Sequence, residues 1–198
     1  MKPATISLHY PFTGEKVRAL NVGDTVKIAG LVFTGRDRLH KHLAETHHSQ
    51  VDLRDGAIFH CGLVVKRDNA GSWRIVAAGP TTSIREEPYM ATIVAEQGVR
   101  VVIGKGGLGE GSLAAFAKHG CAYIQAVGGA AAVIAETVKE VIAVHFLEEF
   151  GATEAMWVLR VDGLEGIVGM DAHGHSLYDV TTLASKQALD ALLNRNSN

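Results

Sequence analysis

The sequence has few cysteines, few prolines and no long apolar run, and each scarcity excludes a class of protein. Its two cysteines, Cys61 and Cys121, lie far apart, which argues against a disulfide framework and for a reducing compartment. Two thiolates are also too few for an iron–sulfur cluster held by this chain alone, which needs about four. No run approaches the roughly 18 apolar residues of a membrane span, and residues 1–14 lack the apolar segment of a secretory signal. The sequence therefore predicts a cytoplasmic protein with no membrane partner.

An excess of one charge sign is also missing. The chain has 19 basic and 21 acidic side chains, and the basic ones are scattered, so nothing predicts a nucleic-acid partner. Its 198 residues predict a single domain over 1–198, with a tail, 195–198, that we expect to fray. The 22 glycines, against four prolines, predict many turns and close backbone contacts.

Segments of strand and helix character alternate through the middle of the chain, which is typical of a mixed α/β fold. We expect strands over residues 24–31, 57–65, 73–78, 100–103, 120–125, 155–161 and 166–171. We expect helices over residues 37–48, 112–119, 130–141 and 181–194, and a further helix between residue 82 and residue 97. The apolar runs on either side of residues 66–71 predict a hairpin.

A glycine cluster at residues 104–109 formally matches the dinucleotide pattern G-x-G-x-x-G. The acidic residue that this pattern needs about 20 positions later is missing, and no G-K-[ST] sequence is present, so nucleotide binding is disfavoured. Lys105 nevertheless stands between two glycines at the carboxyl end of an apolar strand, where open α/β sheets bind ligands. The lysine is either a solvated loop residue or a point charge for an anion.

A second candidate loop, residues 79–85, joins a predicted strand to a helix start. Ser83 and Glu86 fit a capping box, but Pro88 suits only a first helical turn, so a helix start near Pro88 is the alternative. In either case hydroxyl groups, free N–H groups and the Arg85 guanidinium converge where a helix end favours anions. Ordinary capping beside an exposed arginine is the alternative interpretation.

Ten histidines include three close pairs, which we interpret as surface or helix-end residues rather than a zinc site, because zinc needs three or four ligands. These pairs are His40 with His42, His47 with His48, and His173 with His175.

Taken together, the motifs resemble the β subunit of two-subunit class I fumarate hydratases and L(+)-tartrate dehydratases, which is the C-terminal domain of single-chain class I fumarases. The matching segments occur in order at residues 34–37 with His40, 56–60, 79–83 with Arg85, 102–107, 126–131, 154–157 and 171–174. The resemblance implies an α/β fold of the swivelling β/β/α three-layer type, with a partly open β assembly.

The resemblance also implies a hydro-lyase that reversibly hydrates fumarate to L-malate. It places a [4Fe–4S] cluster on a partner α subunit, in an α2β2 assembly, where the open iron would act as a Lewis acid on the departing hydroxyl. This chain would hold no metal and would be active only with that partner. L(+)-tartrate dehydratase, mesaconate hydratase and a non-catalytic dicarboxylate-binding or assembly module are the alternatives.

Carried over by motif, the substrate-binding residues are Arg36, Thr81, Arg85 and Lys105, of which the last three are also the candidate catalytic residues. Two arginines suit the two carboxylates of a dianion, and fixed cations would stabilise the charge that builds up when a proton leaves carbon. Thr81 is the family's candidate for moving that proton, although an unassisted hydroxyl is a poor base.

The resemblance gives other residues supporting roles or none. Asp37 and His40 are expected to orient Arg36, while Asp171, His173 and His175 have no assigned role. Many relatives carry methionine after the loop arginine, whereas this chain has Glu86 and Glu87. These carboxylates would either repel a dianion or point into solvent. Residues 128–131 and 148–151 favour fumarase over tartrate dehydratase.

Overall fold

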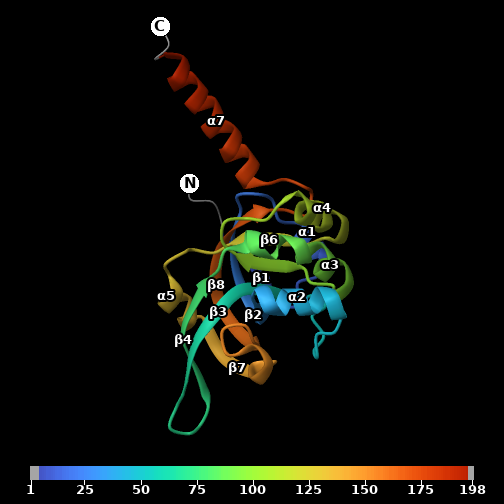
Figure 1. Cartoon of the computed structure of the whole chain (residues 1–198), viewed down its shortest axis with the longest axis vertical. Coiled ribbons are helices and arrows are strands. Elements are labelled where there is room, and N and C mark those ends of the chain that lie inside the picture. The colour runs from blue at the N-terminus through green and yellow to red at the C-terminus, as the bar shows by residue number, and fades with distance from the viewer. Residues whose placement is uncertain (1–4, 196–198) are drawn as a thin grey trace.

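The computed structural model describes residues 5–195 as a mixed α/β structure with an eight-stranded sheet (Figure 1). Its strands are β1 (Ile6–His9), β2 (Thr25–Gly35), β3 (Ala57–Arg67), β4 (Trp73–Pro80), β5 (Val101–Gly104), β6 (Ala122–Gln125), β7 (Val138–His145) and β8 (Met156–Met170). Its helices are α1 (Gly14–Arg18), α2 (Asp37–Thr46), α3 (Glu87–Gln97), α4 (Glu110–His119), α5 (Ala131–Glu136), α6 (Leu147–Phe150) and α7 (Leu177–Arg195). A 3₁₀ helix, η1 (Ser83–Glu86), precedes α3.

Four parallel strands, β2, β3, β5 and β6, form the centre of the sheet. The long strand β8 pairs antiparallel with both β6 and β2, so the hydrogen-bonded path β2–β3–β5–β6–β8 returns to β2. Strand β1 pairs parallel with β2, β7 pairs antiparallel with β8, and β4 forms a hairpin with β3. Because the central strands are parallel, their carboxyl ends meet at one edge of the sheet.

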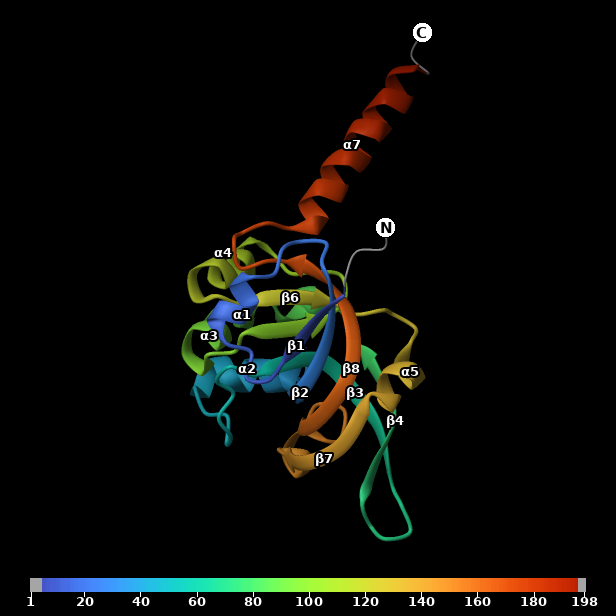
Figure 2. The ribbon, with the colours of Figure 1, turned by 180° about the vertical axis from the view of Figure 1, so that it is seen from behind.

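Alternation along the central strands creates two apolar cores. In β3, Ala57 and Phe59 belong to the first core, which also includes residues of β1, β2, β8 and α1. The intervening Ile58 belongs to the second core, where helix side chains such as Leu43 of α2 and Phe116 of α4 pack. Figure 2 shows α2, α3 and α4 together on this side of the sheet. Since successive side chains of a strand point to opposite faces, one apolar strand serves both cores.

The prediction of one helix over residues 130–141 was wrong in its second half. Helix α5 ends at Glu136, and β7 begins at Val138 because its backbone pairs with β8 from Val138 to His145. The two strands predicted over 155–161 and 166–171 are one strand, β8, with Gly163 in the left-handed region at φ +87°. The short elements β1, α1 and α6 had not been predicted.

Helix α7 projects away from the rest of the molecule (Figure 1). It confirms the helix expected over 181–194, and Arg195, the first residue of the predicted tail, ends it; residues 196–198 lie outside the described part. Several of its leucines are more than half exposed, namely Leu183, Leu189, Leu192 and Leu193. Within residues 5–195, no helix is both long enough and apolar enough to cross a bilayer.

Candidate functional site

Three of the predicted site residues directly follow strand ends at one edge of the sheet. Arg36 follows β2, Lys105 follows β5, and Thr81 follows β4. Residue 60 of β3 pairs with Gly35 at the same edge, and Thr82 bridges Lys105 in parallel fashion. The fourth predicted residue, Arg85, lies on η1, four residues after Thr81. Residues from separate segments of the chain are thus gathered where parallel strands present ligand sites.

Backbone hydrogen bonds join Thr81 to Lys105. The Thr81 N–H donates to the carbonyl of His60 at 2.7 Å, and the Lys105 N–H donates to the carbonyl of Thr81 at 3.3 Å. The Ser83 N–H then donates to the carbonyl of Lys105 at 3.0 Å. The candidate proton-moving hydroxyl and the candidate cation are therefore held on neighbouring stretches of backbone.

Arg36 lies over Gly62 and pairs with Glu154, a residue to which sequence reasoning had given no role. Its Nε is 3.4 Å from the Glu154 Oε1, and its side chain is only 24% exposed. A β-carbon at Gly62 would come within 3.0 Å of the arginine side chain, so the glycine leaves room for it. Glu154 also accepts a hydrogen bond from the N–H of Arg38 at 3.1 Å. The pair therefore holds Arg36 against the start of α2.

Asp37 pairs with Arg85, whereas the sequence had suggested that it orients Arg36. The Arg85 Nη2 lies 3.2 Å from the Asp37 Oδ2, and both side chains are nearly half exposed. His40 does contact Arg36, since its Nδ1 donates to the Arg36 carbonyl at 2.9 Å. Two α2 residues therefore contact the candidate substrate arginines: Asp37 pairs with the Arg85 side chain, and His40 bonds the Arg36 backbone.

Two imidazoles lie buried beneath this surface. His40 and His60 are both fully buried, and their rings meet edge to face with centroids 4.8 Å apart. Burial lowers the pKa of His40 to about 4 and that of His60 well below its ordinary value, so both are neutral at pH 7. The close histidine pairs were expected to be surface or helix-end residues, and His40 lies in the first turn of α2 with its ring packed inside.

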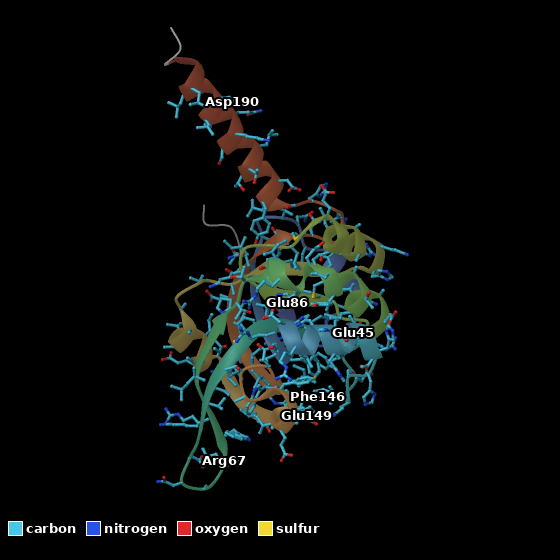
Figure 3. All side chains as sticks on the ribbon, viewed as in Figure 1. Glu45, Arg67, Glu86, Phe146, Glu149 and Asp190 are labelled. Atoms are coloured by element: carbon cyan, nitrogen blue, oxygen red, sulfur yellow. The ribbon has the colours of Figure 1, made fainter. Side chains whose placement is uncertain are left out.

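The two carboxylates after Arg85 adopt neither of the arrangements expected for them. Glu87 caps α4, accepting from the N–H groups of Gly109 at 2.7 Å and Ser112 at 3.1 Å. Figure 3 labels Glu86 within the body of the molecule. Its side chain is fully buried, with its Oε2 3.7 Å from the His40 Nδ1. Burial and, next, the Asp37 carboxylate raise the pKa of Glu86 to about 8. At pH 7 it is mostly neutral and repels no anion.

The capping box proposed for Ser83 and Glu86 is absent. The Ser83 hydroxyl instead lies 2.9 Å from the His60 Nδ1 and 2.9 Å from the Tyr123 hydroxyl. The regular helix α3 begins at Glu87, with Pro88 in its first turn, as the alternative interpretation required. His60 and Ser83 lie inside the segments that carry the resemblance, and Tyr123 had only an apolar strand around it as a signal.

Buried polar side-chain atoms without a hydrogen bond concentrate at this site. Within the described residues these atoms are Arg36 Nε, His40 Nε2, His60 Nε2, Thr81 Oγ1 and the two carboxylate oxygens of Glu86. Buried polar groups in proteins are normally paired, so such a concentration is typical of a surface built to meet a ligand. A cavity of about 550 Å³ lies elsewhere, between β4, α5 and β7, and contains none of the predicted site residues.

Residues 2–181 match the sequence profile of the family described as the fumarase C-terminus. This chain belongs to the fumarase C-terminus family. Over 184 residues it is 47% identical to a Geobacillus stearothermophilus protein named as a class I fumarate hydratase, covering 93% of this chain and 35% of that protein. A Methanocaldococcus jannaschii protein named as an L(+)-tartrate dehydratase subunit beta is 36% identical over 186 residues, which are 91% of this chain and 95% of that protein.

The Escherichia coli K12 L(+)-tartrate dehydratase subunit beta is 35% identical over 174 residues, covering 84% of this chain and 83% of that subunit. The chain thus spans about a third of the Geobacillus protein and most of each β subunit. The fumarase and tartrate dehydratase resemblance drawn from the motifs is confirmed.

Class I fumarases use an iron–sulfur cluster, but the thiols of this family member do not fit one. Cys61 and Cys121 are both buried. Burial raises the pKa of Cys61 to about 12 and that of Cys121 further, so neither is a ready thiolate ligand. Across residues 5–195, no group of three or more His, Cys, Asp or Glu side chains is arranged to hold a metal.

Asp171, for which the resemblance to fumarases gave no role, organises a turn. Its carboxylate accepts from the N–H groups of Val22 at 3.2 Å and of His173 and His175 at 2.9 Å each, and it pairs with the His175 ring at 3.1 Å. Burial opposes the charge, yet these hydrogen bonds lower the pKa of Asp171 overall. The His173 ring bonds the Arg18 carbonyl at 2.9 Å. This segment therefore ties the end of β8 to the N-terminal part of the chain.

Proposed function

We propose that this chain is the β subunit of an iron–sulfur hydro-lyase that reversibly hydrates fumarate to L-malate, with a substrate site shared with an α subunit. The observation that carries the proposal is the hydrogen-bonded junction of Thr81 with Lys105, flanked by Arg36 and Arg85, at one edge of the parallel sheet. The 47% identity to a protein named as a class I fumarate hydratase supports fumarate over the alternatives.

The charges of the site suit a dicarboxylate. Arg36 and Arg85 each present a guanidinium that can form paired hydrogen bonds to one carboxylate, worth about 1.5–3 kcal/mol for each charged hydrogen bond. Each is held by a carboxylate of this chain, Glu154 or Asp37, which restricts the guanidinium before substrate arrives. A rigid cation loses less freedom on binding than a mobile one.

The proton chemistry falls to Thr81 and Lys105. Dehydration of malate removes a proton from the carbon beside a carboxylate, so negative charge builds on that carboxylate. The Lys105 ammonium would stabilise this charge more strongly in the transition state than in the bound substrate. The buried Thr81 hydroxyl, which has no hydrogen-bond partner among residues 5–195, is proposed to contact the proton that moves. As a base it needs activation from neighbouring groups.

The partner and the cofactor are proposals too. The chain spans 35% of the Geobacillus protein named as a fumarate hydratase, and the β-subunit names of the other relatives support an α subunit as partner. Because the thiols of this chain do not fit cluster ligation, we propose that the α subunit holds the [4Fe–4S] cluster, in an α2β2 assembly located in the cytoplasm. We retain the swivelling β/β/α three-layer description and a single domain over 1–198 as part of the proposal.

The alternatives are a hydro-lyase with another substrate and a protein without catalytic activity. L(+)-tartrate or mesaconate would meet the same pair of arginines, and the identities of 35% and 36% to tartrate dehydratase β subunits favour tartrate as the second candidate. A binding or assembly module would retain dicarboxylate binding without turnover. Substrate profiling distinguishes tartrate and mesaconate from fumarate, and dicarboxylate binding without turnover identifies the binding or assembly module.

The test is anaerobic fumarate–malate interconversion, measured for this chain alone and for its complex with a co-expressed α subunit. Activity in the complex and none in the isolated chain is the expected result. If the cluster-loaded complex is inactive on fumarate but active on tartrate or mesaconate, that compound becomes the assigned substrate in place of fumarate. A complex that binds fumarate and turns over none of the three would establish the binding module.

A further inference from the structure

The Ser83 hydroxyl stands at the meeting point of three elements. From η1 it lies 2.9 Å from the His60 Nδ1 of β3 and 2.9 Å from the Tyr123 hydroxyl of β6. All three side chains are fully buried. The serine hydroxyl can satisfy both contacts at once: it donates to one partner and accepts from the other, with the tautomer of His60 set to match. The hydroxyl therefore fastens η1 to two strands of the sheet at once.

The same residues close a ring of hydrogen bonds around the candidate site. Thr81 N–H donates to the His60 carbonyl, Lys105 N–H donates to the Thr81 carbonyl, and Ser83 N–H donates to the Lys105 carbonyl. The contact between the Ser83 hydroxyl and the His60 ring completes the circuit. Of the four contacts in the ring, only this one is made by side chains. A substitution can therefore remove it while leaving the three backbone hydrogen-bonding groups in place.

Gly104 has no side chain, and the Ser83 hydroxyl occupies the space that a side chain there would fill. A β-carbon at Gly104 would lie 2.0 Å from the Ser83 Oγ, 3.1 Å from the His60 Nδ1 and 3.2 Å from the Tyr123 hydroxyl. No side chain fits there without displacing the ring. Gly104, the first glycine of the cluster that resembles a nucleotide motif, thus leaves room for the Ser83 hydroxyl directly before Lys105.

We propose that Ser83 is a positioning residue for the hydration reaction, whose hydroxyl holds Thr81 in register with Lys105. The inference rests on the proposed function and deepens it. Because the Ser83 side chain is fully buried behind the Thr81–Lys105 junction, it acts through those two residues and not on substrate. Misplacing a reacting group by about 1 Å can lower turnover on the order of 100-fold. Binding by Arg36 and Arg85, which are held by other pairs, depends much less on the ring.

The kinetic test compares Ser83→Ala with Ser49→Ala in the complex with the α subunit. Ser49 is a matched control, since its hydroxyl is also buried but bonds the Val51 carbonyl in the loop after α2. We expect Ser83→Ala to lower kcat by about 10-fold or more with KM changed less than about 3-fold, and Ser49→Ala to change neither. If Ser83 acts through Thr81, adding Ser83→Ala to Thr81→Ala should lower kcat by less than about 2-fold more.

A second readout does not depend on activity. Amide hydrogen exchange of the full chain should be faster at residues 79–86 and 104–107 in Ser83→Ala than in wild type, and unchanged there in Ser49→Ala. Tyr123→Phe, which removes one of the two partners and keeps the ring packing, should show a smaller change at the same segments. This milder variant keeps the test informative if Ser83→Ala fails to fold.

Three results would overturn the proposal: unchanged exchange at both segments, full kcat in Ser83→Ala, or an undiminished loss when the substitution is added to Thr81→Ala. Failure of the proposed function looks different, because the wild-type complex itself would then turn over no dicarboxylate. In that case the exchange measurement alone decides whether the serine holds the two segments together.

Discussion

The Arg85 Nη2 lies 3.2 Å from the Asp37 Oδ2, so a candidate substrate cation is already paired within its own chain. Both side chains are nearly half exposed, and an ion pair in water contributes about 1 kcal/mol or less to the stability of the fold. The pair is therefore better suited to orienting the guanidinium than to stabilising the protein. This separation of roles can be measured.

Arg85→Ala should abolish most turnover and leave the fold intact. The variant loses the hydrogen bonds to one substrate carboxylate, so kcat/KM should fall by about 100-fold or more, while the melting temperature stays within about 3 °C. Lys105→Ala should behave in the same way, with its loss mainly in kcat. Arg160→Ala is the matched control, because Arg160 forms a comparably exposed pair with Glu140 at 2.9 Å. An unfolded Arg85→Ala protein would mean that the arginine is structural.

Glu86→Gln should change how stability depends on pH. The folded protein holds the Glu86 proton up to a pKa of about 8, whereas the unfolded chain releases it near the ordinary value of 4.5. Between these values the folded state binds more protons, so the free energy of unfolding of wild type falls as pH rises. The glutamine variant lacks this contribution. Urea unfolding from about pH 6 to pH 9 should show a stability difference that grows in favour of Glu86→Gln.

The exposed Glu45, paired with Lys41 one helical turn away, provides the control for that experiment. Glu45→Gln should follow the wild-type pH dependence throughout. A constant difference between wild type and Glu86→Gln across this range would contradict the assignment of a neutral, buried carboxyl.

Glu87→Ala should destabilise the protein by about 1–2 kcal/mol, because the N–H groups of Gly109 and Ser112 lose their acceptor at the start of α4. Urea unfolding measures the loss. Glu110→Ala is the control: this residue lies in the same first turn but does not cap it. Equal losses in the two variants would count against the cap and leave only a general charge effect at the helix end.

Asp171→Asn should lower stability at neutral pH by about 1–3 kcal/mol, since the carboxylate accepts three backbone hydrogen bonds. The hydrogen bonds hold the folded pKa of Asp171 below its ordinary value of 3.8. The contribution is therefore complete above that value and is lost as pH falls through the lowered folded pKa. Wild type and variant should converge in acid. A difference that does not shrink as pH falls below the ordinary value would show that shape, not charge, accounts for the loss.

Local sequence patterns determined much of this protein. Apolar runs located the central strands and the helices between them, because alternation and helical periodicity are properties of neighbouring residues. Lys105 after an apolar strand, and the hydroxyl groups and arginine of residues 79–85, already suggested an anion site. The ordered motifs added Arg36 and indicated the family, which the comparisons then confirmed.

Tertiary structure alone decided which side chains meet. Residues 138–141 had been predicted as helix and became strand because β8 offered an antiparallel partner. Arg36 pairs with Glu154, and Arg85 pairs with Asp37, although these residues are too far apart in the sequence for a local pattern to predict the contacts. Burial then left Glu86 with a raised pKa and brought His60, Ser83 and Tyr123 together behind the site. Sequence specifies which groups are available, whereas pairing and desolvation depend on long-range packing that exists only in the folded chain.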